Sequence, residues 1–351
     1  METVTYEIRG NIVNNAMRCF WVEKTESGEI NTSVTEKPIS ILDDAKSGSK
    51  TDSPHVRVRV NLSSLNYKDA LAATGHPGIV RRFPHIPGID SVGHVVASED
   101  AAFAIGDEVI VTGNDLGVGH LGAWAEMIDV PSQWVLPLPK TLSPLEAMTL
   151  GTAGFTAAQS VQALISHGVT SDSGSVIVTG ATGGVASISL EILNKLGYKT
   201  IAVTGKKEQH QSLLDRGVDE VLTRSDFVDK SNRPLLSGKY AGAIDTVGGS
   251  MLETVLKSIS YRGCVTACGM AGGAELHTTV HPFILRGITL CGIDSAMCPM
   301  PKRKEIWEKL SGEWKLDGIE SLTTKVPLEQ TPAWVERILA GGVTGRVVVE
   351  L

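Results

Sequence analysis

The side chains best suited to chemistry lie in one tetrapeptide, Asn66-Tyr67-Lys68-Asp69, between a β-like run and a helix-like run. Chains often place reacting groups at such a junction, because the connection presents them on a rigid support. An amide and a phenol can donate hydrogen bonds to a substrate oxygen on which negative charge develops. Lys68 and Asp69 fit better as the first turn of the helix and a local ion pair. The junction is therefore the first candidate for a reacting site.

A glycine-rich loop supplies the second chemical signal. It reads Thr179-Gly180-Ala181-Thr182-Gly183-Gly184-Val185-Ala186, follows the apolar run 176–178 and opens a helix. Glycines permit a tight turn and let backbone N–H groups approach a pyrophosphate at a helix N-terminus. The spacing is G-x-x-G-x-x-A instead of G-x-G-x-x-G, but its strand-to-helix context is that of a dinucleotide site.

The next predicted strand, 201–203, indicates which dinucleotide binds. It ends in Thr204-Gly205-Lys206-Lys207 and lacks the acidic residue that usually holds the ribose hydroxyls of NAD. A hydroxyl and ammonium groups attract a 2′-phosphate, and Arg224, beyond the third strand, can approach the same phosphate. The alternative is a solvated lysine pair. The pattern favours NADPH over NADH.

These motifs need two supporting domains. Residues 17–135 are rich in β-branched runs interrupted by Gly and Pro, whereas strands and helices alternate from about residue 146. Such alternation predicts a parallel sheet covered on both faces. We therefore expect an α/β protein in which a Rossmann domain at 146–298 interrupts a β-rich catalytic domain at 17–145 and 299–351. Residues 1–16 read as an N-terminal extension.

Composition excludes several classes of protein. The net charge of −7, without a basic stripe, argues against nucleic-acid binding. No apolar run is long enough to span a membrane, and the first residues lack a secretory signal pattern. The odd count of 5 cysteines fits reduced thiols in a cytoplasmic protein. Cys264 and Cys268 lie in a strand-like run and are expected to fill the core instead of binding metal.

The domain order is that of the medium-chain dehydrogenases, whose zinc-dependent members use Cys and His ligands with an open fourth position. Asn66 occupies the junction where that Cys would lie, and Gly88-Ile89-Asp90 replaces the usual Gly-His-Glu. A four-Cys lobe for structural zinc is also missing from the sequence. His94 and His120 read as surface or packed imidazoles, so we expect no metal.

Several stretches of the chain resemble one branch of this group closely, from about Met17 to Leu351. They are SSLNYKDALAATG (63–75), FPHIPGIDSVG (83–93), LGTAGFTAAQSVQAL (150–164), AGAIDTVGG (241–249), GCVTACGMAGG (263–273) and HPFILRGITLCGIDS (281–295). They are similar to the YhdH/YhfP-type quinone oxidoreductases, whose established members are acrylyl-CoA reductases that use NADPH. The resemblance implies a zinc-free enzyme with a GroES-like catalytic domain, a Rossmann domain, and a homodimer formed by Rossmann edge strands.

The resemblance also implies roles for individual residues. Tyr67 would lie beside the nicotinamide, and Thr182, Gly183, Gly184 and Val185 would hold the pyrophosphate. Thr204, Gly205 and Lys206 would hold the 2′-phosphate together with Arg224. The segments that would line the nicotinamide side of the cleft contain Met270, Ile284 and Ser295.

Two positions depart from the family pattern. The loop has Ala186 where the family commonly has Gly, which should tighten the packing of helix on strand. Thr204 and Lys206 replace Ser and Arg. A lysine keeps the charge but loses the bidentate fork, which predicts a softer preference for NADPH.

The function expected from this resemblance is reduction of an α,β-unsaturated thioester, acrylyl-CoA to propanoyl-CoA. NADPH would deliver hydride to the β-carbon, and Asn66, Tyr67 or backbone N–H groups would stabilise the enolate oxygen. Arg81 and Arg82 would meet the phosphates of coenzyme A, unless they are simply a solvated pair. Two alternatives stay open: a quinone or small-enone reductase, and a non-catalytic NADPH-binding protein.

Overall fold

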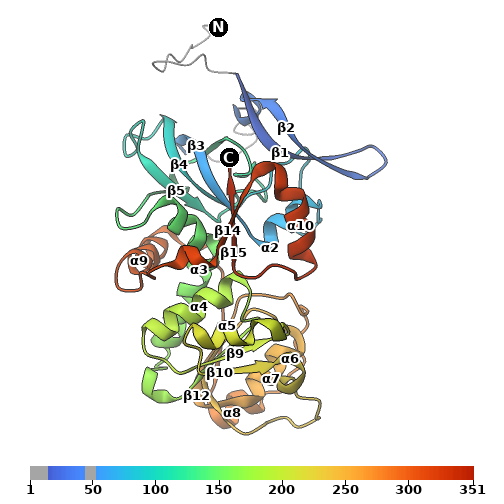
Figure 1. Ribbon diagram of the computed structural model, residues 1–351, viewed down its shortest axis with the longest axis vertical. Coiled ribbons are helices and arrows are strands. Elements are labelled where there is room, and N and C mark those ends of the chain that lie inside the picture. Colours follow the sequence, from blue (N-terminus) through green and yellow to red (C-terminus); the bar gives the residue numbers. More distant parts are fainter. Residues whose placement is uncertain (1–14, 44–52) are drawn as a thin grey trace. The chain divides into compact units, whose positions relative to one another are not determined.

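The computed structural model describes residues 15–43 and 53–351, so most of the expected extension at 1–16 lies outside the described residues; Ala16 already begins strand β1. The chain divides into two compact units. The first contains residues up to 138 together with 325–341 and 348–351, and the second contains 139–324 and 342–347. Figure 1 shows the red C-terminal strands β14 and β15 beside the β-rich part of the chain.

The first unit is built on a seven-stranded sheet with the order β14-β15-β3-β4-β5-β7, in which β6 also pairs with β3. Val56, Val58 and Val60 of β3 are buried, whereas the intervening Arg57 and Arg59 are not. This alternation is typical of a sheet with one buried face. The strands are β3 (His55–Leu65), β4 (Asp90–Ser98), β5 (Glu108–Thr112), β6 (Met127–Pro131), β7 (Val135–Pro137), β14 (Thr323–Pro327) and β15 (Arg346–Glu350).

A separate hairpin and two helices complete this unit. Strands β1 (Ala16–Lys24) and β2 (Ile30–Pro38) pair antiparallel with each other. Helix α2 (Tyr67–Ala73) follows β3 directly and packs against α10 (Thr331–Leu339). The candidate junction at Asn66 therefore lies between the longest strand of the sheet and a short helix.

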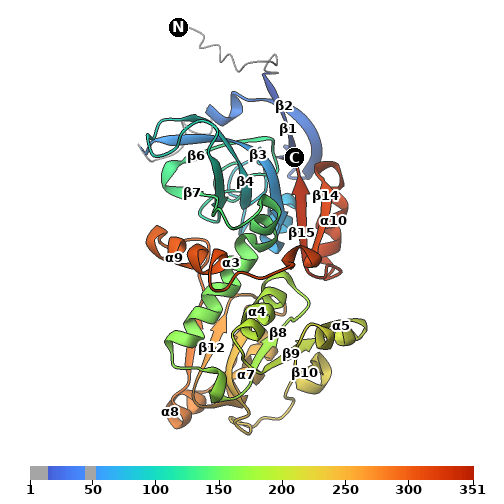
Figure 2. The same ribbon diagram turned by 60° about the vertical axis from the view of Figure 1, so that its left-hand side comes forward.

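The second unit holds the doubly wound sheet that the sequence predicts. Six parallel strands follow the order β10-β9-β8-β11-β12-β13. Successive strands extend the sheet to one side of β8 as far as β10 and then to its other side from β11 onwards, so the strand order reverses beside β8. Every residue of β8 and β11 is buried, as expected when helices cover both faces (Figure 2). The strands are β8 (Val176–Thr179), β9 (Thr200–Thr204), β10 (Glu220–Thr223), β11 (Tyr240–Asp245), β12 (Ile259–Ala267) and β13 (Thr289–Gly292).

Helix α3 shows how closely local sequence sets the elements of this unit. Ser143 caps it by accepting a hydrogen bond from the backbone N–H of Glu146, whose carboxylate accepts one from Ser143 in return. Gly151 then breaks the helical backbone with a φ of 46°. The helices are α3 (Pro144–Ser166), α4 (Gly184–Lys195), α5 (His210–Asp215), α6 (Arg224–Phe227), α7 (Gly249–Ser258), α8 (His281–Arg286) and α9 (Met300–Ser311).

The segment 299–324, assigned to the catalytic domain from the sequence, lies in the second unit. The reason is the packing of α9 on α3. The guanidinium of Arg303 lies 4.7 Å from the centroid of the Phe155 ring, and Trp307 stacks on the same ring at 6.4 Å. The alternation of strands and helices in the sequence stops before α9. The pattern therefore did not predict that α9 packs on α3.

Two compositional expectations can be compared with the described residues. Cys264 is fully buried, in line with a core position, while Cys268 is half-buried, and all five cysteines are free thiols. None of the described helices combines the length and the apolar character that crossing a membrane requires.

Candidate active site

Most of the residues predicted to hold the pyrophosphate and the 2′-phosphate follow strands at one edge of the six-stranded sheet, because the carboxyl ends of parallel strands meet there. The loop 180–185 follows β8, and Thr204 ends β9. The register of the sheet pairs Thr204 with Thr223, the last residue of β10. Arg224 follows Thr223 directly, so the structure brings it next to the segment that follows Thr204.

The glycine loop is held by hydrogen bonds between neighbouring strand ends. The Oγ1 atom of Thr179 donates to Oδ1 of Asp245 over 2.7 Å and accepts from the backbone N–H of Thr246 over 3.1 Å. Gly180 has a φ of +64°, and a Cβ atom there would lie 2.5 Å from Oγ1 of Thr246. Only glycine fits this turn, which aims the following residues at the start of α4.

The N-terminus of α4 suits an anion. Gly183 is its N-cap and offers no side chain to the first backbone N–H groups of the helix. These groups and the helix dipole favour a negatively charged ligand such as a pyrophosphate. Ala186, the departure from the family pattern, is buried within the helix face. Its methyl group thus lies on the packed side of the helix.

Lys206 has partners that the sequence did not reveal. Its Nζ atom donates to the carbonyl of Val343 over 2.7 Å and to Oγ1 of Thr344 over 3.0 Å, and its backbone N–H donates to Oγ1 of Thr204 over 3.1 Å. The C-terminal segment therefore returns to the predicted phosphate corner and fixes the lysine there. Residues 343 and 344 lie far along the chain from Lys206, and no local sequence motif predicts that they contact it.

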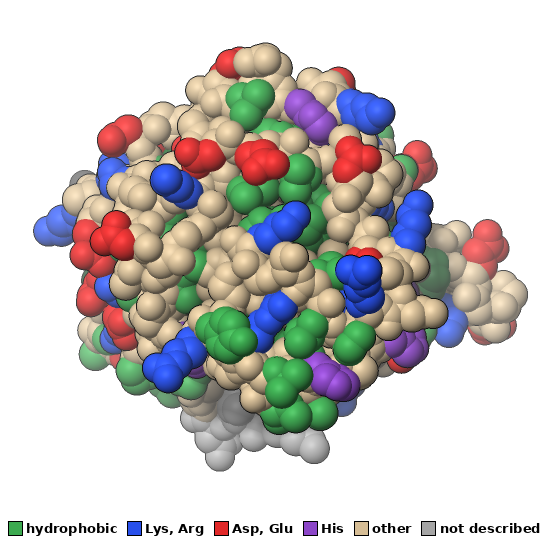
Figure 3. Space-filling model, turned by 90° about the horizontal axis from the view of Figure 1, so that it is seen from below, with side chains coloured by type: hydrophobic (Ala, Val, Ile, Leu, Met, Phe, Trp, Pro, Cys, Tyr) green, Lys and Arg blue, Asp and Glu red, His purple; other side chains and the backbone are tan. Residues whose placement is uncertain are grey.

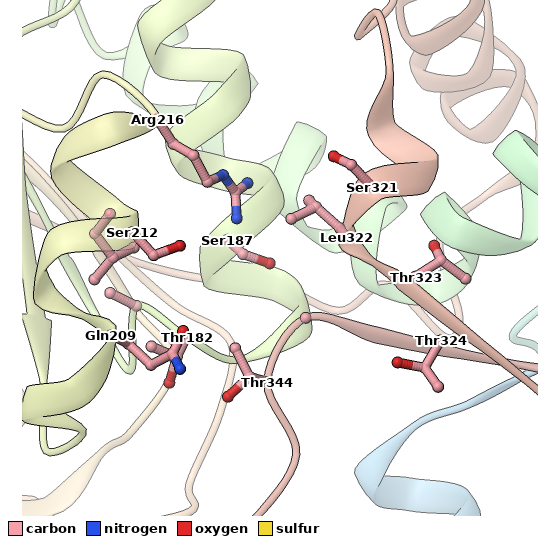
Figure 4. Close-up of a pocket in the computed structure, with 13 residues that line it drawn as sticks. Thr182, Ser187, Gln209, Ser212, Arg216, Ser321, Leu322, Thr323, Thr324 and Thr344 are labelled. Atoms are coloured by element: carbon pink, nitrogen blue, oxygen red, sulfur yellow. The ribbon is translucent and has the colours of Figure 1, made fainter.

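A pocket of about 250 Å³ adjoins the glycine loop (Figure 4). Gln209, Ser212 and Arg216 line it from the α5 side, at spacings of three and four that place them on one helical face. Thr182 of the glycine loop faces them, as does Ser187 of α4. The Nε atom of Arg216 donates to Oε1 of Glu191 over 2.8 Å. Sequence reasoning missed this pocket, although the spacing along α5 was visible.

Met270 and Ser295 follow the other two strands at the same edge. Met270 lies three residues beyond β12, and Ser295 lies three residues beyond β13. The backbone N–H of Ile293 donates to the carbonyl of Ala267 over 3.0 Å, which keeps the two strand ends together. Both predicted residues therefore belong to the edge that carries the glycine loop.

Ile284 lies on a helix anchored away from that edge, and its place beside the nicotinamide stays a prediction. It lies on α8, where the guanidinium of Arg286 donates to the carbonyls of Lys257 and Ile259 over 2.9 and 2.8 Å. Ile259 begins β12, so α8 is anchored at the opposite end of the strands. The motif at 281–295 resembles the family, but it does not show at which end of the sheet this short helix lies.

At the junction in the first unit, Asn66 caps α2. Its side-chain Nδ2 donates to Oδ2 of Asp69 over 3.0 Å, to Oδ2 of Asp90 over 2.8 Å and to Oγ of Ser64 over 3.2 Å. Its backbone N–H donates to Asp69 over 2.8 Å. The amide hydrogens thus point at buried carboxylates. This geometry shows that Asn66 positions the start of α2, and its expected catalytic role stays a prediction.

Asp69 is a buried carboxyl with a perturbed pKa. Its Oδ1 accepts from the backbone N–H groups of Ile89 and Gly88 over 2.8 and 3.2 Å. Burial, reinforced by the Asp90 carboxyl, raises the pKa of Asp69 to about 7, although hydrogen bonds from Asn66 and Ile89 act in the opposite direction. As expected from the sequence, Asp69 serves the helix N-terminus, but its partners are Asn66 and backbone groups.

Tyr67 begins α2 and points away from this network. It is 46% exposed, and the structure records no hydrogen bond to its hydroxyl from any described residue. Arg81 and Arg82 are exposed in the connection between α2 and β4. Of the residues predicted in this unit, only Tyr67 combines a polar group with an open position at the junction.

The donors at this junction do not fit zinc, which prefers thiolate and imidazole ligands in such sites. The cluster consists of Ser64, Asn66, Asp69 and Asp90, and the amide hydrogens of Asn66 occupy the space between the carboxylates. Within residues 15–43 and 53–351, a group of three side chains able to share a metal ion occurs elsewhere, in the second unit.

Comparisons with known proteins agree with this architecture. The family model for the alcohol dehydrogenase GroES-like domain matches residues 52–140, and that for zinc-binding dehydrogenase matches residues 184–311. The chain is 44% identical over 333 residues to the putative quinone oxidoreductase YhfP of Bacillus subtilis, covering 95% of this chain and 99% of YhfP. The solved structure of YhfP, with NAD bound, has a TM-score of 0.89 at 42% identity and covers 96% of this chain and 99% of that one.

Two further relatives are named as a reductase and an oxidoreductase. The probable acrylyl-CoA reductase AcuI of Escherichia coli is 44% identical over 296 residues, which cover 84% of this chain and 91% of AcuI. The YhdH oxidoreductase of Salmonella enterica, solved in complex with NADP, has a TM-score of 0.88 at 42% identity, covering 95% of this chain and 99% of that one. The chain therefore belongs to the medium-chain dehydrogenase/reductase family of oxidoreductases, in the branch that includes YhfP and AcuI.

Proposed function

We propose that the protein is an NADPH-dependent reductase of α,β-unsaturated thioesters and that it converts acrylyl-CoA to propanoyl-CoA. The observation that carries the proposal is the array of strand ends in the second unit, where the glycine loop, Thr204, Lys206 and Arg224 follow three neighbouring strands. This array suits a dinucleotide with a 2′-phosphate. The name of the relative AcuI supports the choice of acrylyl-CoA.

Bound NADPH would supply a hydride to the β-carbon of the substrate. The residues of this chain must then stabilise the negative charge that moves onto the thioester oxygen, and a proton must reach the α-carbon. Tyr67 is our choice for the first task, because its hydroxyl is exposed and has no recorded partner among the described residues. The same hydroxyl, or water, then provides the proton.

The preference between cofactors rests on two cations. Lys206 is held by Val343 and Thr344, whereas Arg224 is exposed at the start of α6. We therefore assign the larger part of the 2′-phosphate recognition to Arg224. The solved YhdH structure contains NADP and the solved YhfP structure contains NAD. Both dinucleotides therefore occur among the relatives, and we expect the residues around the 2′-phosphate position to determine the preference in this protein.

The proposed enzyme is a homodimer joined at the free edge of its six-stranded sheet. Strand β13 is the last strand of the sheet, and an edge strand presents unpaired backbone groups to a partner. Val280, Ile284 and Leu285 are exposed on or beside α8, which precedes β13. Figure 3, seen from the end at which α8 lies in Figure 1, shows apolar side chains on this face, interspersed with basic, acidic and histidine side chains. Light scattering of the purified protein at several concentrations tests this part of the proposal.

The enzymatic proposal is tested by following NADPH absorbance with acrylyl-CoA, crotonyl-CoA and a simple quinone at matched concentrations, with NADH alongside. We expect a much higher kcat/KM for acrylyl-CoA with NADPH than for the quinone. Turnover of the quinone alone would favour a quinone reductase, the function that the name of YhfP suggests. NADPH binding without turnover of any of these compounds would leave a non-catalytic binding protein.

A further inference from the structure

A cluster of one imidazole and two thiols lies in the second unit, outside the cofactor edge. His167 follows α3 directly, Cys264 lies within β12, and Cys291 lies within β13. Their potential ligand atoms all lie within 4.8 Å of one another. We propose that His167, Cys264 and Cys291 form a binding site for a thiophilic divalent cation, Zn²⁺. The bound cation would link the end of α3 to strands β12 and β13.

The distances match those of a tetrahedral zinc site. The two sulfur atoms are 3.8 Å apart, and Nε2 of His167 lies 3.7 Å from the sulfur of Cys291. Zinc bonds to sulfur at about 2.3 Å and to nitrogen at about 2.0–2.1 Å, so tetrahedral angles place two sulfurs about 3.8 Å apart and a sulfur and a nitrogen about 3.6 Å apart. The two sulfurs are therefore already spaced for an ion, and a rotation of the imidazole supplies the third ligand.

His167 has a backbone partner that leaves Nε2 unprotonated. Its Nδ1 lies 2.8 Å from the carbonyl oxygen of Ala163, so Nδ1 carries the proton and donates it to that carbonyl. The sulfur of Cys291 lies 3.7 Å from Nε2 and 3.9 Å from Nδ1, so the ring must turn to aim the lone pair of Nε2 at an ion held by the two sulfurs. Metal-binding histidines commonly have this backbone partner, which fixes the tautomer. The carbonyl groups at the end of α3 also favour a nearby cation.

A disulfide between the two cysteines fits the sheet less well. Cys264 pairs with Thr289, whereas Cys291 pairs with Thr266, so the two cysteines are two residues out of register. Such diagonal neighbours have Cα atoms about 7–8 Å apart, and a disulfide rarely spans more than about 7 Å. A cation accepts the longer separation, because it bridges the sulfurs without a bond between them.

The burial of the three ligands leaves a path for the ion. Cys264 is buried, Cys291 is half-buried and His167 is exposed, so the cluster opens to solvent on the side of His167. A water molecule can occupy the fourth position there. The residues of this cluster are not part of the proposed cofactor corner, and the inference holds whatever substrate the protein reduces.

Cobalt titration of the full-length, chelator-treated and reduced protein tests the site directly. We expect one Co²⁺ per chain to produce the visible bands of a tetrahedral complex and a thiolate-to-cobalt charge-transfer band, and Zn²⁺ to displace both. Cys291→Ser should weaken binding by more than about 100-fold, since loss of even an outer partner typically costs 10–100-fold. His167→Gln, at an exposed position, should weaken it without disturbing the fold, as circular dichroism would verify.

Cys268→Ser is the matched control, because Cys268 lies on the same chain segment as Cys264 but outside the cluster. It should bind Co²⁺ like the parent protein. The proposal fails if the parent shows no charge-transfer band, or if the band survives unchanged in Cys291→Ser or His167→Gln. It also fails if mild oxidation of the metal-free protein links Cys264 to Cys291 quantitatively, as peptide mass mapping would show.

Discussion

The side-chain amide of Asn66 donates to Asp90 over 2.8 Å and, at the same time, to Asp69 over 3.0 Å. Both carboxyl groups are fully buried, so they depend on such donors for the solvation that they have lost. The residue at the strand-to-helix junction thus joins β4 to the first turn of α2. Through this joint it sets the position of Tyr67, the next residue in the chain.

Asn66→Ala should lower the free energy of unfolding by about 1–3 kcal/mol, because it removes one hydrogen-bond donor from each of two buried carboxyl groups. Urea denaturation provides the measurement. Asn61→Ala is the matched control: the Asn61 side chain is exposed and bonds only to His94 among its recorded partners, so a change within about 0.5 kcal/mol is expected. Equal losses in the two variants would show that the buried network contributes little.

The raised pKa of Asp69 predicts a pH dependence of stability. The pKa of this carboxyl is about 7 in the folded protein and about 3.9 when unfolded. Between these values the folded state binds more protons than the unfolded state, so the contribution of Asp69 to stability falls as pH rises from about 4 to about 7. Above pH 7 this contribution stays constant at its lowest level.

His85 acts in the opposite direction across the same range, so a comparison of variants is needed. Burial lowers the pKa of His85 to about 4, and its contribution to stability therefore rises with pH up to about 6.5. Asp90→Asn leaves Asp69 buried but removes the neighbouring charge that adds to the effect of burial on the pKa of Asp69, and it leaves His85 unchanged. The stability of Asp90→Asn minus that of the parent should increase from pH 4 to pH 7 in thermal denaturation. A flat difference would contradict the coupling of the two carboxyl groups.

The cofactor edge could be predicted from sequence because each of its parts follows a strand within a regular alternation. Thr182 and Thr204 needed only the pattern of strand, loop and helix, and the parallel register then places Arg224 beside them. The partners of Lys206 could not be predicted in this way. They lie 137 and 138 residues further along the chain, and only the folded structure brings them back.

Other limits of the prediction have a similar origin. Ile284 lies in a motif that resembles the family, but sequence alone does not show that α8 is anchored by Arg286 at the far end of the strands. The sequence singled out Asn66, but its hydrogen bonds depend on two carboxyl groups whose burial is a property of the fold. Residue type pointed to the junction as a candidate site, and tertiary contacts determine which partners each side chain has there.

Arg224→Ala should raise the KM for NADPH and leave that for NADH nearly unchanged. The loss of a hydrogen-bonded charge opposite a phosphate corresponds to about 1.5–3 kcal/mol, or roughly 10–150-fold in kcat/KM. Steady-state kinetics with both cofactors measures the ratio. Lys207→Ala removes an exposed charge from the neighbouring turn and serves as the control. An equal effect of the two substitutions would indicate a general electrostatic attraction of the phosphate instead of a specific contact with Arg224.

Gly180→Ala should destabilise the glycine loop strongly, since it combines a φ of +64° with a contact of 2.5 Å to Thr246. Weaker NADPH binding and a lower melting temperature are expected together. Gly205→Ala is the control for folding, because a Cβ at position 205 meets no atom within 4 Å and needs no positive φ. Its melting temperature should match that of the parent. A Gly180→Ala protein with unchanged binding and stability would mean that the loop can adopt another turn.

Tyr67→Phe separates the two roles open to this residue, hydrogen-bond donation and packing of the ring. If the hydroxyl stabilises the developing enolate, its removal should lower kcat about 10²–10³-fold, as for other oxyanion donors, while NADPH binding stays the same. Tyr261→Phe removes an exposed hydroxyl in the second unit, on strand β12, and should leave kcat unaltered. Retention of kcat in Tyr67→Phe would assign the enolate to backbone N–H groups or water. In that case Tyr67→Ala, which also removes the ring, should raise the KM for NADPH, because only the packing role would remain.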